Sequence, residues 1–208
     1  MMAPVGSEYD ARGDQGQPDD DWNLIRRVGL GDQPALEQLY KQYYGGLYRF
    51  ILQITRRVDY VEEVINDVMF VVWEKAPDVV PLSKASTWIL GIAHNKALQA
   101  LRRNRSTTGA SLHEGDHIDL RPDKSMSFGE LETKEVLFAL MRKLSPEQRA
   151  VLELVYYHGL HYAEIAQVID CPENTVKTRV FHARRKLREI WPELTGTRAP
   201  DINEIDRR

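Results

Sequence analysis

The segment from Tyr162 to Leu187 restricts the fold of this chain more than any other. Apolar residues recur at helical spacing on both sides of a turn of only about three to four residues around Pro172. One helix is expected over Tyr162 to Ile169, and a second from about Glu173 or Asn174 to Ile190. Ala166 is small, which suits a close crossing of the two. Helices joined this tightly must cross steeply, so the segment predicts a helix-turn-helix.

The second helix of this pair is basic on its outer face, and Glu189 is the only acid beyond its first residues. Such a helix can enter the major groove, where its N-terminal part contacts bases and flanking cations such as Arg184, Arg185 and Lys186 hold phosphates. The alternative is an ordinary solvated amphipathic helix, but the short turn and the small crossing residue favour DNA binding. The candidate DNA contacts are Glu173, Asn174, Thr175, Lys177, Thr178, Arg179, Phe181, His182, Arg184, Arg185 and Lys186.

Helical periodicity extends upstream of this motif. Ser145-Pro146-Glu147 has the order of an N-cap, a first-turn proline and an early acid, and Gly159 suits the C-terminal end of the helix that follows. Before it lies an apolar stripe formed by Val136, Leu137, Leu140, Met141 and Leu144. Together these segments predict a helical domain over residues 131–191.

A first helical domain is expected over residues 22–105. Apolar residues recur at helical spacing from Trp22 onward, and no segment alternates strictly as a strand would. One helix is predicted from Asp59 to Ala76 and ends before Pro77. Another is predicted from Ser86 or Thr87 to about Arg103. The Gly45-Gly46 pair either breaks a helix or lies inside one. The fold class is therefore all-α, with two small helical domains.

The helix predicted from Asp59 divides into two faces. One face is apolar and is expected to point inward, and it consists of Val61, Val64, Ile65, Val68, Met69 and Val72. The other is an acidic ridge that ends in an aromatic residue, and it consists of Asp59, Glu62, Glu63, Asn66, Asp67 and Phe70. Such a ridge suits docking to a basic helical partner, although ordinary solvated charge explains the acids equally well.

Residues 79–113 contain no acid, whereas Lys84, Lys96 and several arginines are basic. Cations that track phosphates, next to aromatic and short polar side chains, suit single-stranded or melting DNA. Asn95 is the best candidate for a base contact, because a carboxamide can bond to base edges. Trp88 is more often a core residue than a platform for base stacking.

Three segments flank these domains and have loop composition. Residues 1–21 carry six acids against one base (Arg12) and are expected to form a disordered acidic arm. Residues 106–130 are expected to form a flexible linker, rich in polar residues and mildly acidic. Residues 192–208 are expected to form a tail after a stop at Pro192.

Whole-chain features exclude several classes of protein. The single cysteine, Cys171, cannot form an internal disulfide, and it suggests a reducing cytoplasm and a small turn residue rather than a redox sensor. No apolar run approaches the length needed to span a membrane, and the acidic N-terminus does not resemble a signal peptide. A phosphate-binding glycine loop, a nucleophile with its base and a plausible metal-ligand cluster are all absent. His113 and His117 have helical spacing but lie in the linker. We therefore expect no enzyme activity, no cofactor and no metal.

The two halves, in this order, resemble the extracytoplasmic-function sigma factors, the compact members of the sigma-70 family that keep only regions two and four. The resemblance covers roughly residues 22–105 and 131–190. In region two it rests on Asp-Val-Met-Phe-Val-Val-Trp and on Thr-Trp-Ile-Leu-Gly-Ile-Ala-His-Asn followed by Leu-Arg-Arg. In region four it rests on Leu-Ser-Pro-Glu-Gln-Arg, Tyr-Ala-Glu-Ile-Ala and Thr-Val-Lys-Thr-Arg. Each motif is moderately specific alone, and all of them in register are a specific signal.

The resemblance implies a role for each surface. The ridge would bind the coiled coil of the polymerase beta-prime subunit through Asp59, Glu62, Glu63, Asn66, Asp67, Phe70 and Trp73. The loop and helix after it would capture and melt the promoter minus-ten element through Ser83, Lys84, Ser86, Thr87, Trp88, Asn95, Lys96, Gln99, Arg102 and Arg103. The helix from Asn174 would contact the minus-thirty-five element, and region four would also meet the beta flap. An anti-sigma factor and a stress or envelope response are further expectations of the resemblance.

Two departures and one alternative accompany this interpretation. The family usually has Ser where Thr178 stands, and often has Arg where His182 stands, which leaves the minus-thirty-five sequence open. The alternative function is a two-domain regulator that binds an operator without being a polymerase subunit. A receiver domain would be α/β with acidic clusters at strand ends, so the acid-free stretch after residue 78 favours the sigma factor.

Overall fold

The structure, a computed structural model, describes residues 18–108, 136 and 139–195. Across these ranges all regular secondary structure is α-helical. This result confirms the all-α fold class predicted from the apolar periodicity. Among the described residues, no helix is both long enough and apolar enough to cross a membrane.

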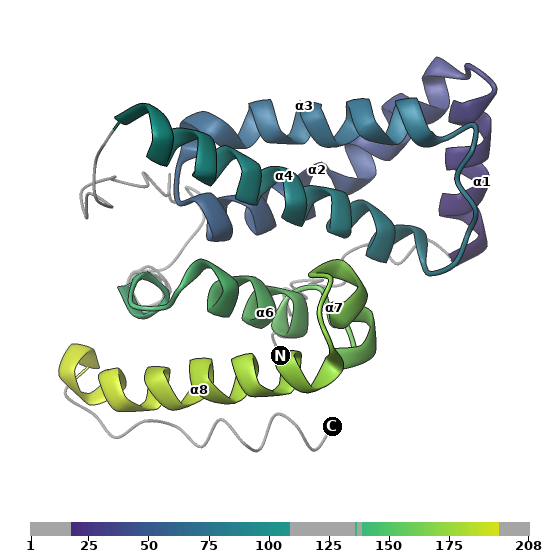
Figure 1. Ribbon diagram of the computed structural model, residues 1–208. Coiled ribbons are helices and arrows are strands. Elements are labelled where there is room, and N and C mark those ends of the chain that lie inside the picture. The colour runs from purple at the N-terminus through teal and green to yellow at the C-terminus, as the bar shows by residue number, and fades with distance from the viewer. Residues whose placement is uncertain (1–17, 109–135, 137–138, 196–208) are drawn as a thin grey trace, which may run out of the picture.

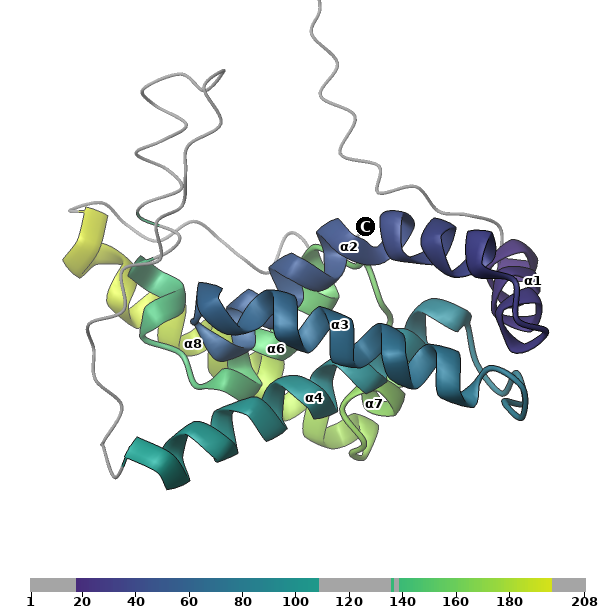
Figure 2. The same ribbon diagram turned by 90° about the horizontal axis from the view of Figure 1, so that it is seen from above.

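The first domain is a bundle of four helices: α1 (Pro18–Gly29), α2 (Gln33–Thr55), α3 (Val58–Lys75) and α4 (Ala85–Thr108). The helices α2, α3 and α4 lie side by side, and α1 crosses one end of them (Figures 1 and 2). Fully buried side chains such as Phe50, Ile65 and Ile89 come from three different helices and form a shared core. Burial of such side chains is the main stabilising contribution to a bundle of this kind.

Local sequence explains where α2 begins and ends. Asp32 is its N-cap, and the Asp32 side chain accepts a hydrogen bond from the amide of Ala35 at 3.2 Å. The helix ends at Arg56, which adopts the left-handed conformation with φ 58°. The Gly45-Gly46 pair lies inside α2, so the second of the two sequence-based interpretations holds.

The second domain contains α6 (Pro146–Tyr156), α7 (Tyr162–Val168) and α8 (Glu173–Thr195), preceded by helical residues 139–142. Ser145 caps α6 as predicted, because its side chain accepts from the Gln148 amide and the Gln148 side chain accepts from the Ser145 amide. The chain turns after α6 at Gly159, whose φ is 63°. Of the apolar stripe before α6, Leu140, Met141 and Leu144 are buried.

Two predicted boundaries are wrong. The arm was expected to be disordered through residue 21, but α1 begins at Pro18, and Asp21 is buried with hydrogen-bond partners on α2. Pro192 was expected to stop α8, but the helix continues to Thr195. A proline this near the end of a helix leaves only the carbonyl of residue 188 without its usual donor, and Arg188 is exposed, so water can replace that bond. Residues 1–17, most of the predicted linker and residues 196–208 lie outside the described residues.

The two domains pack against each other. The helix α6 lies on α2, and α7 lies on α4 (Figure 1). Buried residues of both domains therefore belong to one continuous apolar cluster. The sequence predicted two domains but did not predict this contact.

Candidate nucleic-acid interface

The C-terminal motif has the geometry of a helix-turn-helix. Ile165 of α7 is fully buried against the second helix, and Val176 and Val180 of α8 face it from their buried stripe. The turn between the helices passes through Asp170, whose φ is 48°, and Pro172. Cys171 lies half-buried in this turn. The predicted short turn is confirmed, since only residues 169–172 separate α7 from α8.

The outer face of α8 presents the groove-facing candidates to solvent. Lys177, Thr178, Phe181 and His182 are exposed, and the rings of Phe181 and His182 contact each other edge to face at 5.5 Å between centroids. Lys177 pairs with Glu173 at 2.7 Å, one turn away. Exposed pairs of this kind contribute little and are screened by salt, so Lys177 can exchange its carboxylate for a phosphate.

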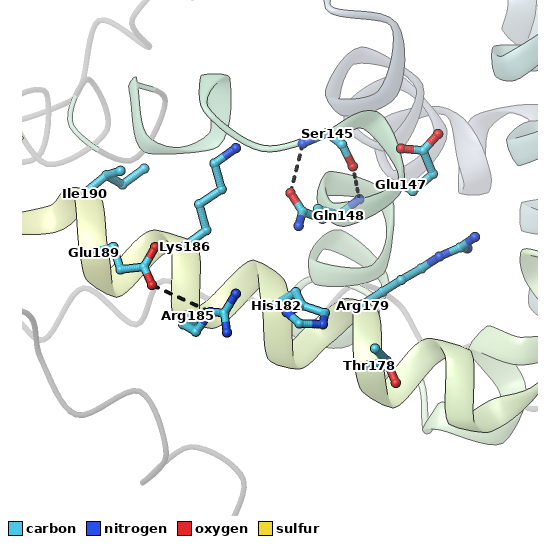
Figure 3. A pocket seen from close by; sticks show the side chains of 10 residues that line it. All are labelled: Ser145, Glu147, Gln148, Thr178, Arg179, His182, Arg185, Lys186, Glu189 and Ile190. Carbon is cyan, nitrogen blue, oxygen red and sulfur yellow. Dashed lines mark hydrogen bonds and ion pairs between the residues drawn. The ribbon is translucent and has the colours of Figure 1, made fainter.

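A groove separates the start of α6 from the outer face of α8 (Figure 3). Ser145 and Gln148 line one wall, and Arg179, Arg185 and Lys186 line the other. The start of α6 carries the partial positive charge of a helix N-terminus, which adds to the charge of the three cations. Glu147 and Glu189 are the acids at this site, and Arg185 lies 3.6 Å from Glu189. The balance of charge favours an anion such as a phosphate.

Arg184 is placed differently from the other cations of α8. Its side chain is 8% exposed, its Nε donates to the Tyr156 hydroxyl at 2.7 Å, and its guanidinium lies over the Tyr156 ring. The prediction that Arg184 contacts phosphate does not fit this position, because the residue connects α8 to α6. Arg184 follows Val180 by one helical turn and so lies on the same, buried face of α8. The helical spacing in the sequence could therefore have predicted that Arg184 is buried.

On α4, the predicted DNA contacts from Asn95 onward are exposed or pair with α3, whereas Thr87 in the first turn is covered. Asn95, Gln99 and Arg102 are exposed, which leaves them available to nucleic acid. Lys96 and Arg103 turn toward the neighbouring helix α3 and pair there with Asp67 at 3.6 Å and with Glu63 at 2.6 Å. Two of the predicted DNA-binding cations are therefore paired with two acids of the predicted polymerase-docking ridge.

Thr87 lies on the face of α4 that meets α7, together with Gly91 and His94, which are not among the predicted DNA contacts. Thr87, Gly91 and His94 follow one another at helical spacing, and a Cβ atom on Gly91 would lie 3.6 Å from the carbonyl oxygen of Val168 on α7. Thr87 is only 3% exposed and His94 only 6% exposed. The Thr87 hydroxyl and His94 Nδ1 are buried without a hydrogen-bond partner among the described residues. Buried polar groups are normally paired, so this face is better suited to a polar ligand than to permanent burial.

The remaining minus-ten candidates lie at or before the first turn of α4. Ser83 is half-buried, Ser86 is half-buried, and Lys84 is exposed. Trp88 is half-buried with its ring 5.7 Å from that of Trp22 on α1. Trp88 is therefore packed as a core residue would be, which leaves only part of its ring for nucleic acid.

The acidic ridge on α3 separates from the apolar face as predicted. Val61, Val64, Ile65, Val68, Met69 and Val72 are all buried. Asp59, Glu62, Glu63, Asn66, Asp67, Phe70 and Trp73 are all exposed. Phe70 and Trp73 are 57% and 51% exposed, and their rings lie 5.8 Å apart. An exposed aromatic pair at the end of an acidic ridge is typical of a protein-binding surface.

The interface between the domains is held by polar contacts that the sequence did not reveal. Arg149 of α6 is 5% exposed and donates to the carbonyl oxygens of Gln53 and Ile54 at the end of α2. Glu153, one turn further along α6, is buried and pairs with Arg49 of α2. Burial raises the pKa of Glu153, and the neighbouring Arg49 opposes that shift. The only sequence signal was that Arg149 and Glu153 occupy apolar positions in a helix.

Two histidines also lie at this interface, one from each domain: His94 is buried and His158 is half-buried. His94 of α4 lies near Arg179 and Glu147, and burial lowers its pKa to about 4. His158, just after α6, contacts Phe50 edge to face and lies beside Gly46 of α2. Burial, with a contribution from Arg49, lowers the pKa of His158 to about 4 as well. Among the described residues, no group of three or more histidine, cysteine or acidic side chains could hold a metal ion.

Comparison with known proteins places both domains in one family. Residues 39–107 match the family described as Sigma-70 region 2, and residues 134–187 match the family described as Sigma-70, region 4. The chain is 30% identical over 182 residues to the ECF RNA polymerase sigma factor SigK of Mycobacterium ulcerans, covering 85% of this chain and 96% of the relative. It is 29% identical to the protein of the same name from Mycolicibacterium vanbaalenii, covering 80% and 86%.

Solved structures share the fold. CnrH in complex with the cytosolic domain of CnrY superposes with a TM-score of 0.61 at 22% identity, covering 83% of this chain and 97% of CnrH. The sigma factor RpoE of Bartonella quintana, in complex with the anti-sigma factor NepR, gives the same TM-score and identity over 74% of this chain and 95% of RpoE.

Proposed function

Because this chain belongs to the extracytoplasmic-function sigma factors of RNA polymerase, we propose that it binds core polymerase through α3 and presents α4 and α8 to promoter DNA. The observation that carries the proposal is the separation of charge over three surfaces. The ridge on α3 is acidic with two exposed aromatic residues, whereas the outer faces of α4 and α8 are basic. One surface suits a basic protein helix and the other two suit phosphates.

The acidic ridge is the proposed contact with the coiled coil of the beta-prime subunit. Phe70 and Trp73 would insert between side chains of the coiled coil, while Glu62 and Asp67 would pair with its basic residues. Aromatic side chains at the centre of an interface generally contribute most of the binding energy, and charges at its rim contribute orientation.

The outer face of α4 and the loop before it are the proposed minus-ten surface. Asn95 and Gln99 carry amides that can bond to base edges, and Arg102 can hold the backbone. A single strand contacted in this way would be drawn from the duplex, because its unpaired bases gain partners on the protein that paired bases lack.

The start of α8 is the proposed minus-thirty-five surface. Thr178 and His182 face solvent on the side of α8 that lines the groove, and Arg185 and Lys186 follow them along the helix (Figure 3). A helix inserted in the major groove from this end would place Lys177, Thr178 and His182 near base edges. The cations further along would hold phosphates, and region four would also contact the beta flap.

The protein acts in this proposal by binding alone, in the cytoplasm where promoters and polymerase are found. An anti-sigma factor is a further proposed partner. Its support is that CnrH was solved with CnrY, and that RpoE of Bartonella quintana was solved with the anti-sigma factor NepR. Such a partner would hold the factor inactive until a stress or envelope signal releases it.

Run-off transcription tests the proposal. Core polymerase is incubated with and without the purified chain over a library of genomic fragments, and new transcript starts are mapped. Defined starts that share two short upstream elements would support the proposal. Silence from a core enzyme that accepts other sigma factors, together with operator binding by the chain alone, would favour a regulator that is not a polymerase subunit.

A further inference from the structure

The loop between α3 and α4, residues 76–84, leaves large apolar side chains in water. Leu82 is 89% exposed and Val80 is 67% exposed, on either side of Pro81. Neither side chain contributes to the core of the bundle. Exposed apolar groups beside Lys84, in the acid-free stretch that begins after Asp78, suit an unstacked base whose phosphate lies nearby.

A loop that receives a single base must already have the right shape, because ordering it during binding would reduce the affinity. Loops that carry function are usually positioned by a rigid scaffold. In this protein the scaffold is α1, which runs alongside the loop from one end to the other (Figures 1 and 2).

The two ends of α1 contact the two ends of the loop. Near the start of α1, Trp22 Nε1 donates a hydrogen bond to the carbonyl oxygen of Ser83 at 2.9 Å, and the Trp22 ring packs against Trp88. At the other end, Gly29 approaches the backbone of Ala76 so closely that a Cβ atom on Gly29 would lie 2.9 Å from the Ala76 carbonyl. The loop is therefore fixed where it leaves α3 and where it enters α4.

The helix α1 is itself anchored beside Trp22. Asp21 is 7% exposed and accepts hydrogen bonds from the Tyr43 hydroxyl at 2.5 Å and from Gln42 Nε2 at 2.7 Å, both on α2. Burial and the bond to Asp21 raise the pKa of Tyr43, so its hydroxyl keeps the proton that it donates. Two hydrogen bonds to a buried carboxylate set the position of the adjacent Trp22.

We propose that Trp22 is a positioning residue for promoter opening, which holds the loop of residues 76–84 in the shape that presents Val80 and Leu82 to a base of the minus-ten element. The inference rests on the proposed function, because it assumes that this loop meets DNA. It adds α1 to the DNA-reading machinery, although α1 contributes no predicted DNA contact. The hydrogen bond from Trp22 to Ser83 positions the loop, and the packing of the Trp22 ring stabilises the fold.

Trp22→Phe separates these two roles, because phenylalanine keeps an aromatic ring against Trp88 and lacks the N–H donor. Trp22→Ala removes both, and Tyr48→Phe serves as a control that removes a polar group from a half-buried aromatic residue on α2. Each variant is tested as a holoenzyme with core polymerase. The measurements are the melting temperature of the free protein, the affinity for core, and the rate of strand opening at a promoter that the wild type opens, followed by permanganate reactivity.

Trp22→Phe is expected to leave the affinity for core unchanged, to lower the melting temperature by only a few degrees and to slow opening about 3- to 10-fold, the range expected for one lost hydrogen bond. Trp22→Ala is expected to slow opening further, and Tyr48→Phe to match the wild type. Opening by Trp22→Phe at the wild-type rate would overturn the inference and leave the proposed function intact. An equal loss of core affinity, melting temperature and opening would also overturn it, since Trp22 would then be purely structural. If the wild type opened no promoter with core, the proposed function itself would fail.

Discussion

The ammonium group of Lys84 lies 2.8 Å from a carboxylate oxygen of Glu164, and this pair joins the residue just before α4 to α7, the first helix of the helix-turn-helix. The other carboxylate oxygen of Glu164 accepts from the amide of His161 at 2.9 Å and so caps α7. Burial alone would raise the pKa of Glu164, but the bonds from Lys84 and His161 outweigh burial and lower it. Glu164 therefore remains a carboxylate near neutral pH.

In this structure the two domains pack against each other, and we call this arrangement the closed state. The closed state covers part of the proposed minus-ten surface but leaves the proposed polymerase-binding surface exposed. It pairs Lys84 with Glu164 and buries Thr87, whereas Phe70 and Trp73 on the ridge stay exposed. We therefore expect the closed protein to bind core polymerase before it binds the minus-ten element. Separation of the two domains would follow docking, and it would expose the rest of the proposed minus-ten surface on α4.

Arg149→Met is expected to open the domains. Its three guanidinium nitrogens donate to the carbonyl oxygens of Gln53, Ile54 and Leu144, and burial lowers its pKa to about 10, so it stays charged at neutral pH. Methionine fills a similar volume but donates nothing, and it leaves buried acceptors unpaired at a cost of about 1–3 kcal/mol. The radius of gyration, measured by small-angle scattering, should increase, and the free protein should bind a single-stranded minus-ten oligonucleotide more tightly.

Lys41→Met is the matched control for this experiment. Lys41 pairs with Glu37 on the exposed side of α2, so the loss of one cationic side chain there should alter neither the radius of gyration nor oligonucleotide binding. A wild-type radius of gyration for Arg149→Met would show that the apolar contacts alone hold the domains together.

Acidification is expected to open the domains as well. His94 and His158 have pKa values lowered to about 4 by burial, against an ordinary value of 6.5. A histidine whose pKa is lower in the closed state stabilises that state above about pH 6.5, and this stabilisation is lost as the pH falls toward 4. The closed state should lose about 1.4 kcal/mol per histidine for each pH unit within that window. Scattering or energy transfer between labelled domains, from pH 7.5 to pH 5, measures the change.

Other charged groups at the interface also affect the expected pH dependence, either by shifting the pKa values of the two histidines or by titrating themselves. Arg179 lowers the pKa of His94 and Glu147 raises it, while Arg49 lowers the pKa of His158. Glu153 acts in the opposite direction, because its raised pKa makes the closed state bind more protons as the pH falls. Replacing both His94 and His158 with glutamine should flatten the pH dependence, and replacing the exposed His182 with glutamine should not. An unchanged profile in the double variant would assign the opening to a carboxylate whose pKa is lowered at the interface, such as Glu164 beside Lys84.

Local sequence predicted the helices and the exposed faces well. The burial of Val64 and Val68, the exposure of Glu63 and Asp67, and the cap at Ser145 all follow from residues within a turn or two of one another. Helical spacing decides which side of a helix is buried, and that information is local.

The same spacing does not identify what covers a buried face. Arg149 bonds to Gln53, 96 residues earlier, and Trp22 bonds to Ser83, 61 residues later. Nothing near Arg149 in the sequence shows that its partner is the end of another helix. The domain contact and the role of α1 could therefore be found only once the helices were placed in space.

Phe70→Ala is expected to weaken binding to core polymerase about 10- to 100-fold, as loss of a central aromatic residue does in other interfaces. Because Phe70 is 57% exposed, the free energy of unfolding should change by less than about 0.5 kcal/mol. Leu30→Ala is the control, since Leu30 is a large apolar residue exposed outside the ridge. Titration of labelled protein with core measures the affinity. If the Phe70 variant and the wild type bound core polymerase equally well, the acidic ridge would not be the docking surface.

Two residues of α8 should affect DNA binding in different ways. His182 is proposed to face base edges, so His182→Ala should change the preferred base at one position of the minus-thirty-five element, by about 1–3 kcal/mol. Arg185 is proposed to hold a phosphate, so Arg185→Gln should weaken binding equally for all sequences and reduce the slope of log affinity against log salt by about one.

Glu189→Gln tests whether the effect of Arg185 is local. Arg185 lies 3.6 Å from Glu189, and removing that carboxylate frees the guanidinium for phosphate without changing the residues proposed to contact bases. Holoenzyme binding to a library of minus-thirty-five variants at several salt concentrations distinguishes the three substitutions. Glu189→Gln should bind all sequences slightly more tightly and keep the base preference of the wild type. If Arg185→Gln instead altered the base preference, Arg185 would contact a base, and the groove between α6 and α8 would hold a base edge rather than a phosphate.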